Sequence, residues 1–323
     1  MSLATRAFGY PLNLPPLPTF PRSAANSEHR SHATIDNLEL SMPTVPSTYS
    51  GFLGLELTSD EWLRNHFLAK LPRRVHQISR LPIDAGERVL DVCCGPGHYA
   101  EAFAEMVGTQ GAVHAVDYDP RLIDIAESRR ANLITGDIIK YYCADVAQDD
   151  IPAIIKSQRY DVIVFFNCLS YFKEPVKTIR RYAKILRSGG RIILKDSDFG
   201  HILLAPFDQS LTDRVVEAAQ RSRPLTFDNF LGRRLPSIAR QIAGSSMQIE
   251  IWSYPMLGPM SEEEKQYVSV NLLTLLRQAQ DFLNAEDIAL WEQSFSREKQ
   301  HALLDRVDFF FLMHEIVTVN TLA

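Results

Sequence analysis

The chain has 323 residues, 46% of them hydrophobic, and a formal net charge of -5. This length and apolar content suffice for a full core, and we expect one catalytic domain with additions to it. The acidic balance and the lack of a Lys- or Arg-rich block exclude the electrostatic pattern of a nucleic-acid-binding protein. No stretch approaches the ~20 apolar residues of a membrane span, and the N-terminus lacks the apolar core of a secretory signal. We therefore expect a cytoplasmic protein without membrane contact.

The first 47 residues differ from the rest in composition. They hold seven of the 18 prolines and show no sustained apolar period, which predicts a disordered arm ahead of a domain at 48–323. The first 27 residues contain Arg6 and Arg22 but no acid, so an organelle transit peptide is an alternative interpretation.

A helical cap is expected at 58–80, where Ser59 is a suitable N-cap and Trp62 and Phe67 belong to an apolar side. Short apolar segments then alternate with helical periodicity. Strands are expected at 88–93, 112–116, 139–144, 160–166, 191–195, 248–254 and 309–320. Helices are expected at 98–107, 120–130, 150–157, 174–187 and 208–221, with insertions at 199–246 and 257–308. This alternation predicts a doubly wound, mostly parallel α/β sheet with helices on both faces.

The four cysteines do not have the spacing of a disulfide framework or a zinc site. All lie in or at the ends of expected core strands, and we predict reduced, buried thiols at Cys93, Cys94, Cys143 and Cys168.

The most informative motif lies between the first strand and the helix that follows it. Residues 91–100 read Asp-Val-Cys-Cys-Gly-Pro-Gly-His-Tyr-Ala. Gly95 and Gly97 allow a tight turn and a close approach to a ligand, and the helix start offers free N–H groups to an anion. The spacing also satisfies the dinucleotide fingerprint, so a nicotinamide-dependent oxidoreductase is an alternative.

Three acids end three consecutive expected strands, namely Asp91, Asp117 and Asp145. A carboxylate at the end of the second strand suits a ribose diol. The acid before the turn can meet an ammonium group, and the third can accept from an exocyclic amine. Ammonium, ribose and adenine amine together describe S-adenosylmethionine.

With these residues, the chain resembles the class I S-adenosylmethionine-dependent methyltransferases, especially their small-molecule branch, from about Arg88 to Lys195 and in the two C-terminal strands. The resemblance implies a Rossmann-like, seven-stranded sheet with an antiparallel last strand. Cys93 stands where the family has its first motif glycine, and we expect its φ to be negative. The resemblance implies that the cofactor is bound by Asp91, Cys93, Gly95, Gly97, Tyr99, Asp117, Tyr118, Asp145, Val146 and Asn167. Among these, Asn167 matches the position beside the sulfonium.

Methyl transfer requires alignment of a nucleophile and, for a hydroxyl, removal of its proton. Candidate bases are His98, Asp198 and His201, although His98 is also a candidate cofactor-side donor and Asp198 an ordinary turn-forming acid. Candidate substrate-binding residues are Tyr171, Phe227, Phe230, Arg233 and Arg234, with the two arginines suited to an anionic group or, alternatively, forming a solvated pair.

The carboxylate cluster of metal-dependent catechol enzymes is missing after the fourth strand, so we expect no metal. The leading hypothesis is transfer of a methyl group to an oxygen or nitrogen of a small organic acceptor, such as a secondary metabolite. Two alternatives are a nicotinamide-dependent oxidoreductase and a non-catalytic S-adenosylmethionine-binding partner protein. The expected partner is a small molecule, with a homodimer as a further expectation.

Overall fold

A computed structural model describes residues 58–147, 151–222, 228–242, 245–296 and 302–322. The arm predicted at 1–47 and the candidate Phe227 lie outside them. Within these residues, no helix combines the length and apolar character required to cross a membrane.

Seven strands form one sheet in the order β3-β2-β1-β4-β5-β7-β6. Neighbouring strands among β1 to β5 pair in parallel, whereas β7 is antiparallel to both β5 and β6. The bounds are β1 Arg88–Val92, β2 Ala112–Asp117, β3 Ile139–Cys143, β4 Tyr160–Phe166, β5 Leu186–Ala205, β6 Ser245–Leu257 and β7 Phe310–Leu322. The predicted doubly wound sheet with an antiparallel last strand is confirmed.

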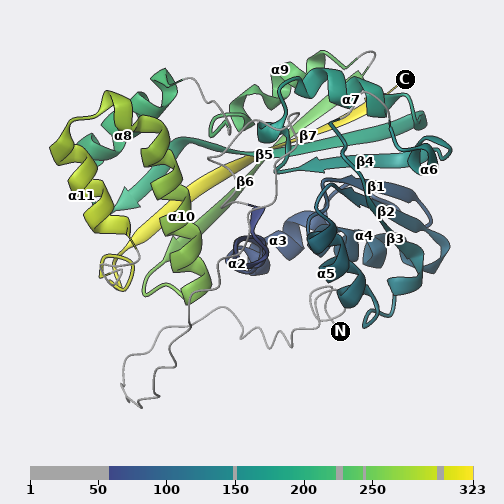
Figure 1. The fold of residues 1–323 in the computed structure, drawn as a ribbon, viewed down its shortest axis with the longest axis horizontal. Coiled ribbons are helices and arrows are strands. Elements are labelled where there is room, and N and C mark those ends of the chain that lie inside the picture. The colour runs from purple at the N-terminus through teal and green to yellow at the C-terminus, as the bar shows by residue number, and fades with distance from the viewer. Residues whose placement is uncertain (1–57, 148–150, 223–227, 243–244, 297–301, 323) are drawn as a thin grey trace.

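Helices cover both faces of the parallel part (Figure 1). One face carries α2 (Asp60–Leu68), α3 (Leu71–Ile78), α4 (His98–Val107) and α5 (Pro120–Arg130). The other carries α6 (Ala153–Lys156), α7 (Pro175–Ala183) and α9 (Leu235–Arg240). Each face of the sheet has its own core, and alternate residues of β1 belong to different ones. Val89 packs in the core below α4, and Leu90 packs in the core below α7. Burial on both sides explains why the parallel strands are almost continuously apolar.

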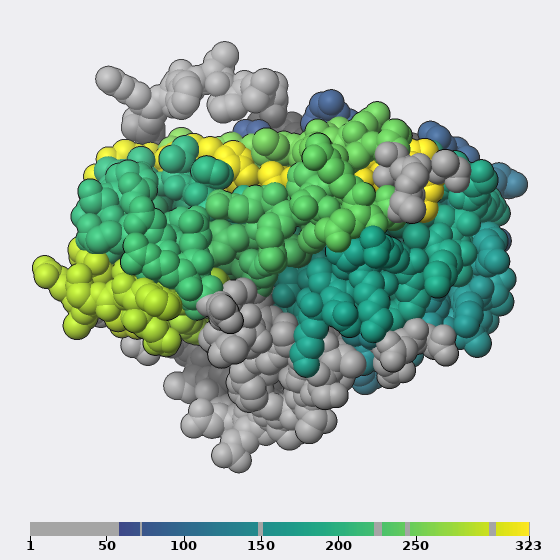
Figure 2. Space-filling view, turned by 90° about the horizontal axis from the view of Figure 1, so that it is seen from above, coloured from purple at the N-terminus to yellow at the C-terminus, as the bar shows by residue number. Residues whose placement is uncertain are grey.

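A third core lies where β5 and β7 extend beyond the parallel strands. There α8 (Gln209–Arg221), α10 (Glu262–Ala279) and α11 (Ala285–Phe295) pack around Trp291 and the strand residues Phe199 and Phe311. Ser261 and Glu264 form a capping box at the start of α10. Figure 2 shows the yellow-green surface of α11 at one end of the molecule and the blue-teal surface of the parallel half at the other.

The length of β5 corrects one prediction. The fifth strand was expected to end at Lys195, with Asp198 and His201 after it, but β5 continues to Ala205 and contains both. The extension is stabilised by β7, which pairs with β5 on both sides of a register shift between Asp198 and Leu203. The sequence pattern missed it because polar residues interrupt the apolar run.

The prediction of four buried thiols was partly wrong. All four cysteines are free, but Cys143 is exposed and Cys93 is only half-buried, whereas Cys94 and Cys168 are buried. Cys143 ends β3, an edge strand of the sheet, so it has a neighbouring strand on one side only.

Candidate functional site

The turn between β1 and α4 has an unusual backbone. Cys93, Gly95 and Gly97 all have positive φ, at 63°, 53° and 84°. The expectation of a negative φ at Cys93 was therefore wrong. A side chain in this region costs conformational energy, which explains why glycine is the family's choice at this position. Asn167, just after β4, also has a positive φ of 54°, so strained backbone occurs at two adjacent strand ends.

The surroundings of position 97, as well as its positive φ, favour glycine over any residue with a side chain. A Cβ added there would overlap the Tyr141 hydroxyl and lie 2.9 Å from Tyr141 Cζ and 3.1 Å from the Ala126 side chain. A side chain at position 97 would therefore have to displace the Tyr141 side chain, and α4 begins at the next residue, His98. The turn brings backbone close to its neighbours, as a ligand-binding cradle requires.

Asp117, at the end of β2, holds this turn in place. Its Oδ2 accepts a hydrogen bond from the Gly95 N–H at 2.8 Å, and its Oδ1 accepts from the Asp119 N–H at 3.1 Å. Burial raises the pKa of Asp117 to about 6, against the opposing effect of these N–H groups. A carboxylate has further lone pairs, so it can still accept from a ligand hydroxyl.

Asp91 is the least satisfied of the three acids. It is 2% exposed, and its Oδ2 has no hydrogen-bond partner among the described residues. Burial, together with the nearby Asp117, raises the pKa of Asp91 to about 8. A buried carboxyl oxygen without a partner is costly and suits a site completed by a cationic ligand group.

Other predicted cofactor residues continue along the same edge of the sheet. Asp145 follows β3 and accepts from the Ala147 N–H at 2.9 Å, and Val146 beside it is buried. Tyr99 lies in the first turn of α4, with its ring 5.0 Å from that of Phe166 and its hydroxyl without a partner among the described residues. Since parallel strands end at one edge, Asp91, Asp117, Asp145 and Asn167 are brought to a common edge.

A buried group of charges lies beside this edge and was missed from the sequence. We call it the Glu315 cluster, and it consists of Lys70, Arg74, Lys195 and Glu315. Lys70 Nζ donates to Glu315 Oε1 at 2.6 Å, and Lys195 Nζ donates to Glu315 Oε2 at 2.9 Å. Arg74 Nη2 lies 3.9 Å from Glu315 Oε1. All four side chains are 0% exposed.

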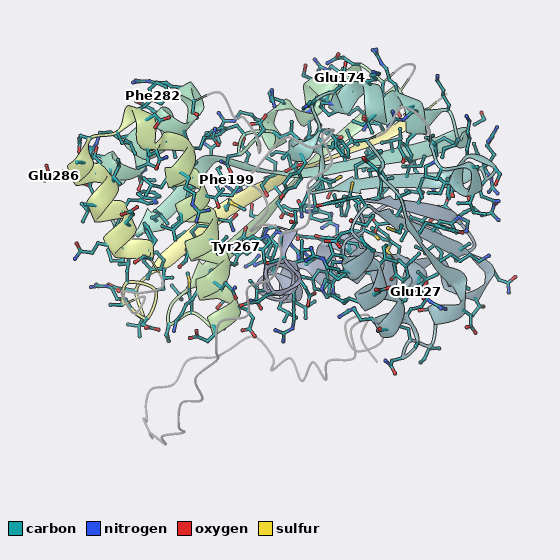
Figure 3. The ribbon with its side chains drawn as sticks, in the orientation of Figure 1. Glu127, Glu174, Phe199, Tyr267, Phe282 and Glu286 are labelled. Carbon is teal, nitrogen blue, oxygen red and sulfur yellow. The ribbon has the colours of Figure 1, made fainter. Side chains whose placement is uncertain are left out.

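Aromatic residues and one histidine surround the Glu315 cluster. The Lys70 ammonium lies 4.6 Å from the Tyr254 ring centre and 4.4 Å from that of Tyr267; Tyr267, on α10, is labelled in Figure 3. Burial and the charges of Lys70 and Arg74 lower the pKa of His66 well below its ordinary value, so this imidazole is neutral. Burial also lowers the pKa of Lys70 to about 7, although Glu315 opposes the shift.

The Glu315 cluster is connected to the motif turn. Lys195 Nζ donates to Asn167 Oδ1 at 2.7 Å. The Arg74 guanidinium lies 5.4 Å from the Tyr99 ring centre and 5.0 Å from that of Phe67. Phe67 in turn stacks on His98, with ring centres 4.5 Å apart. The polar edge of β1 and β4 and the buried charges therefore form one continuous region.

The predicted bases do not all lie together. His98 is buried next to the motif turn, and burial lowers its pKa well below the ordinary value. Asp198 and exposed His201 instead line a pocket of about 470 Å³ with His314. His314 precedes Glu315, so the two side chains point to opposite faces of β7. This pocket is therefore on the other face of the sheet from the Glu315 cluster.

The predicted anion-binding arginines are already paired. Arg233 Nε donates to both carboxylate oxygens of Asp198, at 3.0 and 2.9 Å, and Arg234 forms an ion pair with Asp228. The Arg233 guanidinium also lies 5.3 Å from the ring centre of Phe230, which is buried. These contacts bring Phe230, Arg233 and Asp198 together. The two aspartates, however, already neutralise the arginine charges that a ligand anion would need.

Residues 83–243 match the model of a family described as "Methyltransferase domain". The aklanonic acid methyltransferase DauC of Streptomyces sp. (strain C5) is 35% identical over 127 residues, which are 39% of this chain and 54% of the relative. A 2-phytyl-1,4-naphtoquinone methyltransferase of Synechococcus elongatus is 30% identical over 136 residues, 42% of this chain and 57% of the relative. A ubiquinone biosynthesis O-methyltransferase of Xanthomonas axonopodis pv. citri is 32% identical over 123 residues, 38% and 48% of the two chains. The chain thus spans about half the length of these curated relatives.

The fold also has solved counterparts. A cyclopropane-fatty-acyl-phospholipid synthase-like protein from Lactobacillus casei superposes with a TM-score of 0.52 at 14% identity, covering 81% of this chain and 94% of that one. At this identity the likeness concerns the fold alone.

Proposed function

Because the chain belongs to the class I S-adenosylmethionine-dependent methyltransferases, we propose that it transfers a methyl group from S-adenosylmethionine to an oxygen or nitrogen of a small organic acceptor. The observation that carries this proposal is the buried, unpartnered Oδ2 of Asp91 beside a glycine turn. A cationic ammonium group would satisfy this oxygen, and a side chain at Gly97 would clash with the Tyr141 side chain.

The residues present fit the cofactor. Asp91 would hold the ammonium group, Asp117 the ribose hydroxyls, and Asp145 with Val146 the adenine. The remaining members of the predicted set, Cys93, Tyr99 and Tyr118, are proposed to line the same site. When bound, S-adenosylmethionine supplies an electrophilic methyl group.

The chain itself would align the acceptor and exclude water. Asn167 is proposed to lie beside the methyl group, where its strained backbone is fixed by the hydrogen bond between its Oδ1 and Lys195 Nζ. Burial of Tyr171 raises the pKa of its hydroxyl well above the ordinary value, so it would act as a neutral, aromatic wall of the acceptor site.

The relatives support a narrower acceptor class. Two of their names contain a quinone and one an acid. We therefore propose a cyclic, quinone-like or aromatic acceptor. Incubation of the protein with S-adenosylmethionine and a panel of quinols, phenols and aromatic acids, followed by mass spectrometry, tests the proposal. A methyl-sized mass gain that requires the protein is expected, and none with any class would contradict it.

A base is proposed among His98, Asp198 and His201. His98 lies on the α4 side of the sheet, and Asp198 and His201 lie in the pocket with His314. Substituting the true base should lower kcat by about 10²–10⁴-fold with KM nearly unchanged. Comparison of His98→Gln, Asp198→Asn and His201→Gln therefore assigns the role, and three unaffected variants would mean that transfer relies on alignment alone.

A further inference from the structure

The charges of the Glu315 cluster do not balance. Lys70, Arg74 and Lys195 all lie within 3.9 Å of one carboxylate, that of Glu315. Arginine remains protonated in proteins, and the positive neighbours hold the pKa of Glu315 well below its ordinary value despite the opposing effect of burial. The lowered pKa of Lys70, about 7, leaves this lysine only partly protonated near neutral pH, but Arg74 and Lys195 together still exceed the single charge of Glu315. Burying an ion costs several kcal/mol unless it is paired, so this surplus of cations in a fully buried place requires an explanation.

We propose that Lys70 and Lys195, with Arg74 beside them, bind a carboxylate of the methyl acceptor in a subsite next to the methyl donor. This inference rests on the proposed function and specifies the acceptor further. An acceptor carboxylate would supply the negative charge that Glu315 alone does not, and its planar oxygens suit the fork of an arginine.

Unused donors point to the same ligand group. Arg74 Nε and Nη2 are buried without a hydrogen-bond partner among the described residues, and so is the Tyr99 hydroxyl. The third guanidinium nitrogen, Nη1, donates to the backbone oxygen of His66 at 3.1 Å, which fixes the orientation of the group. This anchored guanidinium already lies near Glu315, at 3.9 Å from Nη2, and interacts with Tyr254, so a ligand carboxylate would be an additional acceptor for donors that are not fully hydrogen-bonded.

The position in the sheet separates this subsite from the amino-acid end of the cofactor. The proposed ammonium ligand Asp91 is on β1, whereas Lys195 is on β5 and Glu315 on β7, two and three strands away. Neighbouring strands are about 4.8 Å apart, so these groups lie on the order of 10–15 Å across the sheet from Asp91. Asn167, which directly follows β4 and accepts a hydrogen bond from Lys195, lies between them. The two lysines therefore lie beyond the proposed methyl position, on the acceptor side.

The cap helices would control access to this subsite. Lys70 is the N-cap of α3 and Arg74 lies within that helix, and both are 0% exposed. An acceptor would therefore reach them only when α2 and α3 move away from β6 and β7.

The test compares a charged and a neutral ligand of matched shape. Binding of 3-hydroxy-2-naphthoic acid and of 3-hydroxy-2-naphthamide to the protein saturated with S-adenosylhomocysteine is measured by calorimetry. The wild type should bind the acid at least about tenfold more tightly, as expected for charge-assisted hydrogen bonds. Lys70→Gln and Lys195→Gln should remove this preference, and Lys195→Arg should retain part of it. Lys177→Gln, at an exposed position of α7, serves as the charge-matched control.

The outcomes are distinguishable. If the wild type does not prefer the acid, or binds neither probe, the inference is overturned without reference to any variant. If the lysine variants keep the acid preference but lose S-adenosylhomocysteine affinity, the cluster serves the cofactor and the inference is again overturned. Failure of the wild type to bind S-adenosylhomocysteine at all would instead overturn the proposed function.

Discussion

The backbone N–H of Gly95 donates a hydrogen bond of 2.8 Å to Oδ2 of Asp117, which joins the motif turn after β1 to the end of β2. The two residues are 22 positions apart in the sequence. One carboxylate therefore both shapes the turn and faces the place proposed for the ribose. The bond explains why the acid at this strand end matters for the cofactor site as a whole.

Replacement of Asp117 by Ala should weaken S-adenosylhomocysteine binding by about 1–3 kcal/mol, because a ligand hydroxyl and the Gly95 N–H would both lose an acceptor. Calorimetry on the purified variant measures the change. Asp124→Ala, on the exposed side of α5, is the matched control and should bind like the wild type. Equal affinities for the Asp117 variant and the control would remove Asp117 from the cofactor site.

Asp91 should make cofactor binding depend on pH. Its pKa is about 8 in the free protein, and an ammonium group would favour the ionised form. The affinity for S-adenosylhomocysteine should therefore rise as the pH increases toward 8, by up to about tenfold per pH unit. Calorimetry at pH 6 in buffers of different ionisation enthalpy should detect release of about one proton on binding, and Asp91→Asn should abolish the release.

The same shift affects the stability of the free protein. The unfolded chain ionises Asp91 near its ordinary pKa of 3.8, whereas the folded chain retains the proton up to about pH 8. Between these two pH values the folded state therefore binds more protons than the unfolded state. The contribution of Asp91 to the free energy of unfolding falls as the pH rises from 3.8 to 8. The contribution of Asp91 is the difference in unfolding free energy between the wild type and Asp91→Asn at each pH. If this difference increased with pH, it would contradict the burial of a neutral acid.

Two glycines provide a matched test of the turn. Gly86 and Gly97 both have φ of 84°, but a Cβ would meet nothing within 4 Å at Gly86 and would overlap Tyr141 at Gly97. Gly86→Ala should cost about 1–2 kcal/mol in unfolding free energy from the backbone alone and leave ligand binding intact. Gly97→Ala should cost more and also weaken S-adenosylhomocysteine binding. Identical effects of the two changes in denaturation and calorimetry would show that the turn tolerates a side chain.

Glu315 should be essential to the stability of the cap. Its replacement by Gln would leave Lys70, Arg74 and Lys195 buried without a counter-charge, at a cost of about 3–5 kcal/mol. Since the pKa of Glu315 is lowered from 4.5, its contribution is fully present above pH 4.5 and is lost as the pH falls further. Urea denaturation checks the loss, with Glu292→Gln on the exposed side of α11 as control. A loss no larger than that of the control would mean that the cluster is not held by its carboxylate.

The parallel half of the fold could be predicted because each of its strands is a short apolar run between helical segments. The glycine turn and the three strand-end acids similarly placed Asp91, Asp117 and Asp145 on one edge. The length of β5 could not be predicted, because it depends on pairing with a strand more than 100 residues later, and Asp198 and His201 were misplaced as a result. Periodicity reports burial of a segment, not the identity of its partner.

The Glu315 cluster was missed for a related reason. Its members come from α3 and its N-cap, β5 and β7, and only the folded sheet brings them together. One indication was present in the sequence, namely a glutamate within the apolar run of residues 309–319, where an unpaired charge would be costly. That indication suggests a buried partner but does not say which cation supplies it.

The central claim is that the edge formed by Asp91, Asp117 and Asp145 binds S-adenosylmethionine, and not a nicotinamide dinucleotide. Side-by-side calorimetric titration of the wild-type protein with S-adenosylhomocysteine and with NADH tests it most directly. The account predicts saturable, one-to-one binding of S-adenosylhomocysteine and much weaker binding of NADH, because the buried Asp91 is placed for an ammonium group, which a nicotinamide dinucleotide lacks. Tighter binding of NADH, or no binding of S-adenosylhomocysteine, would contradict it.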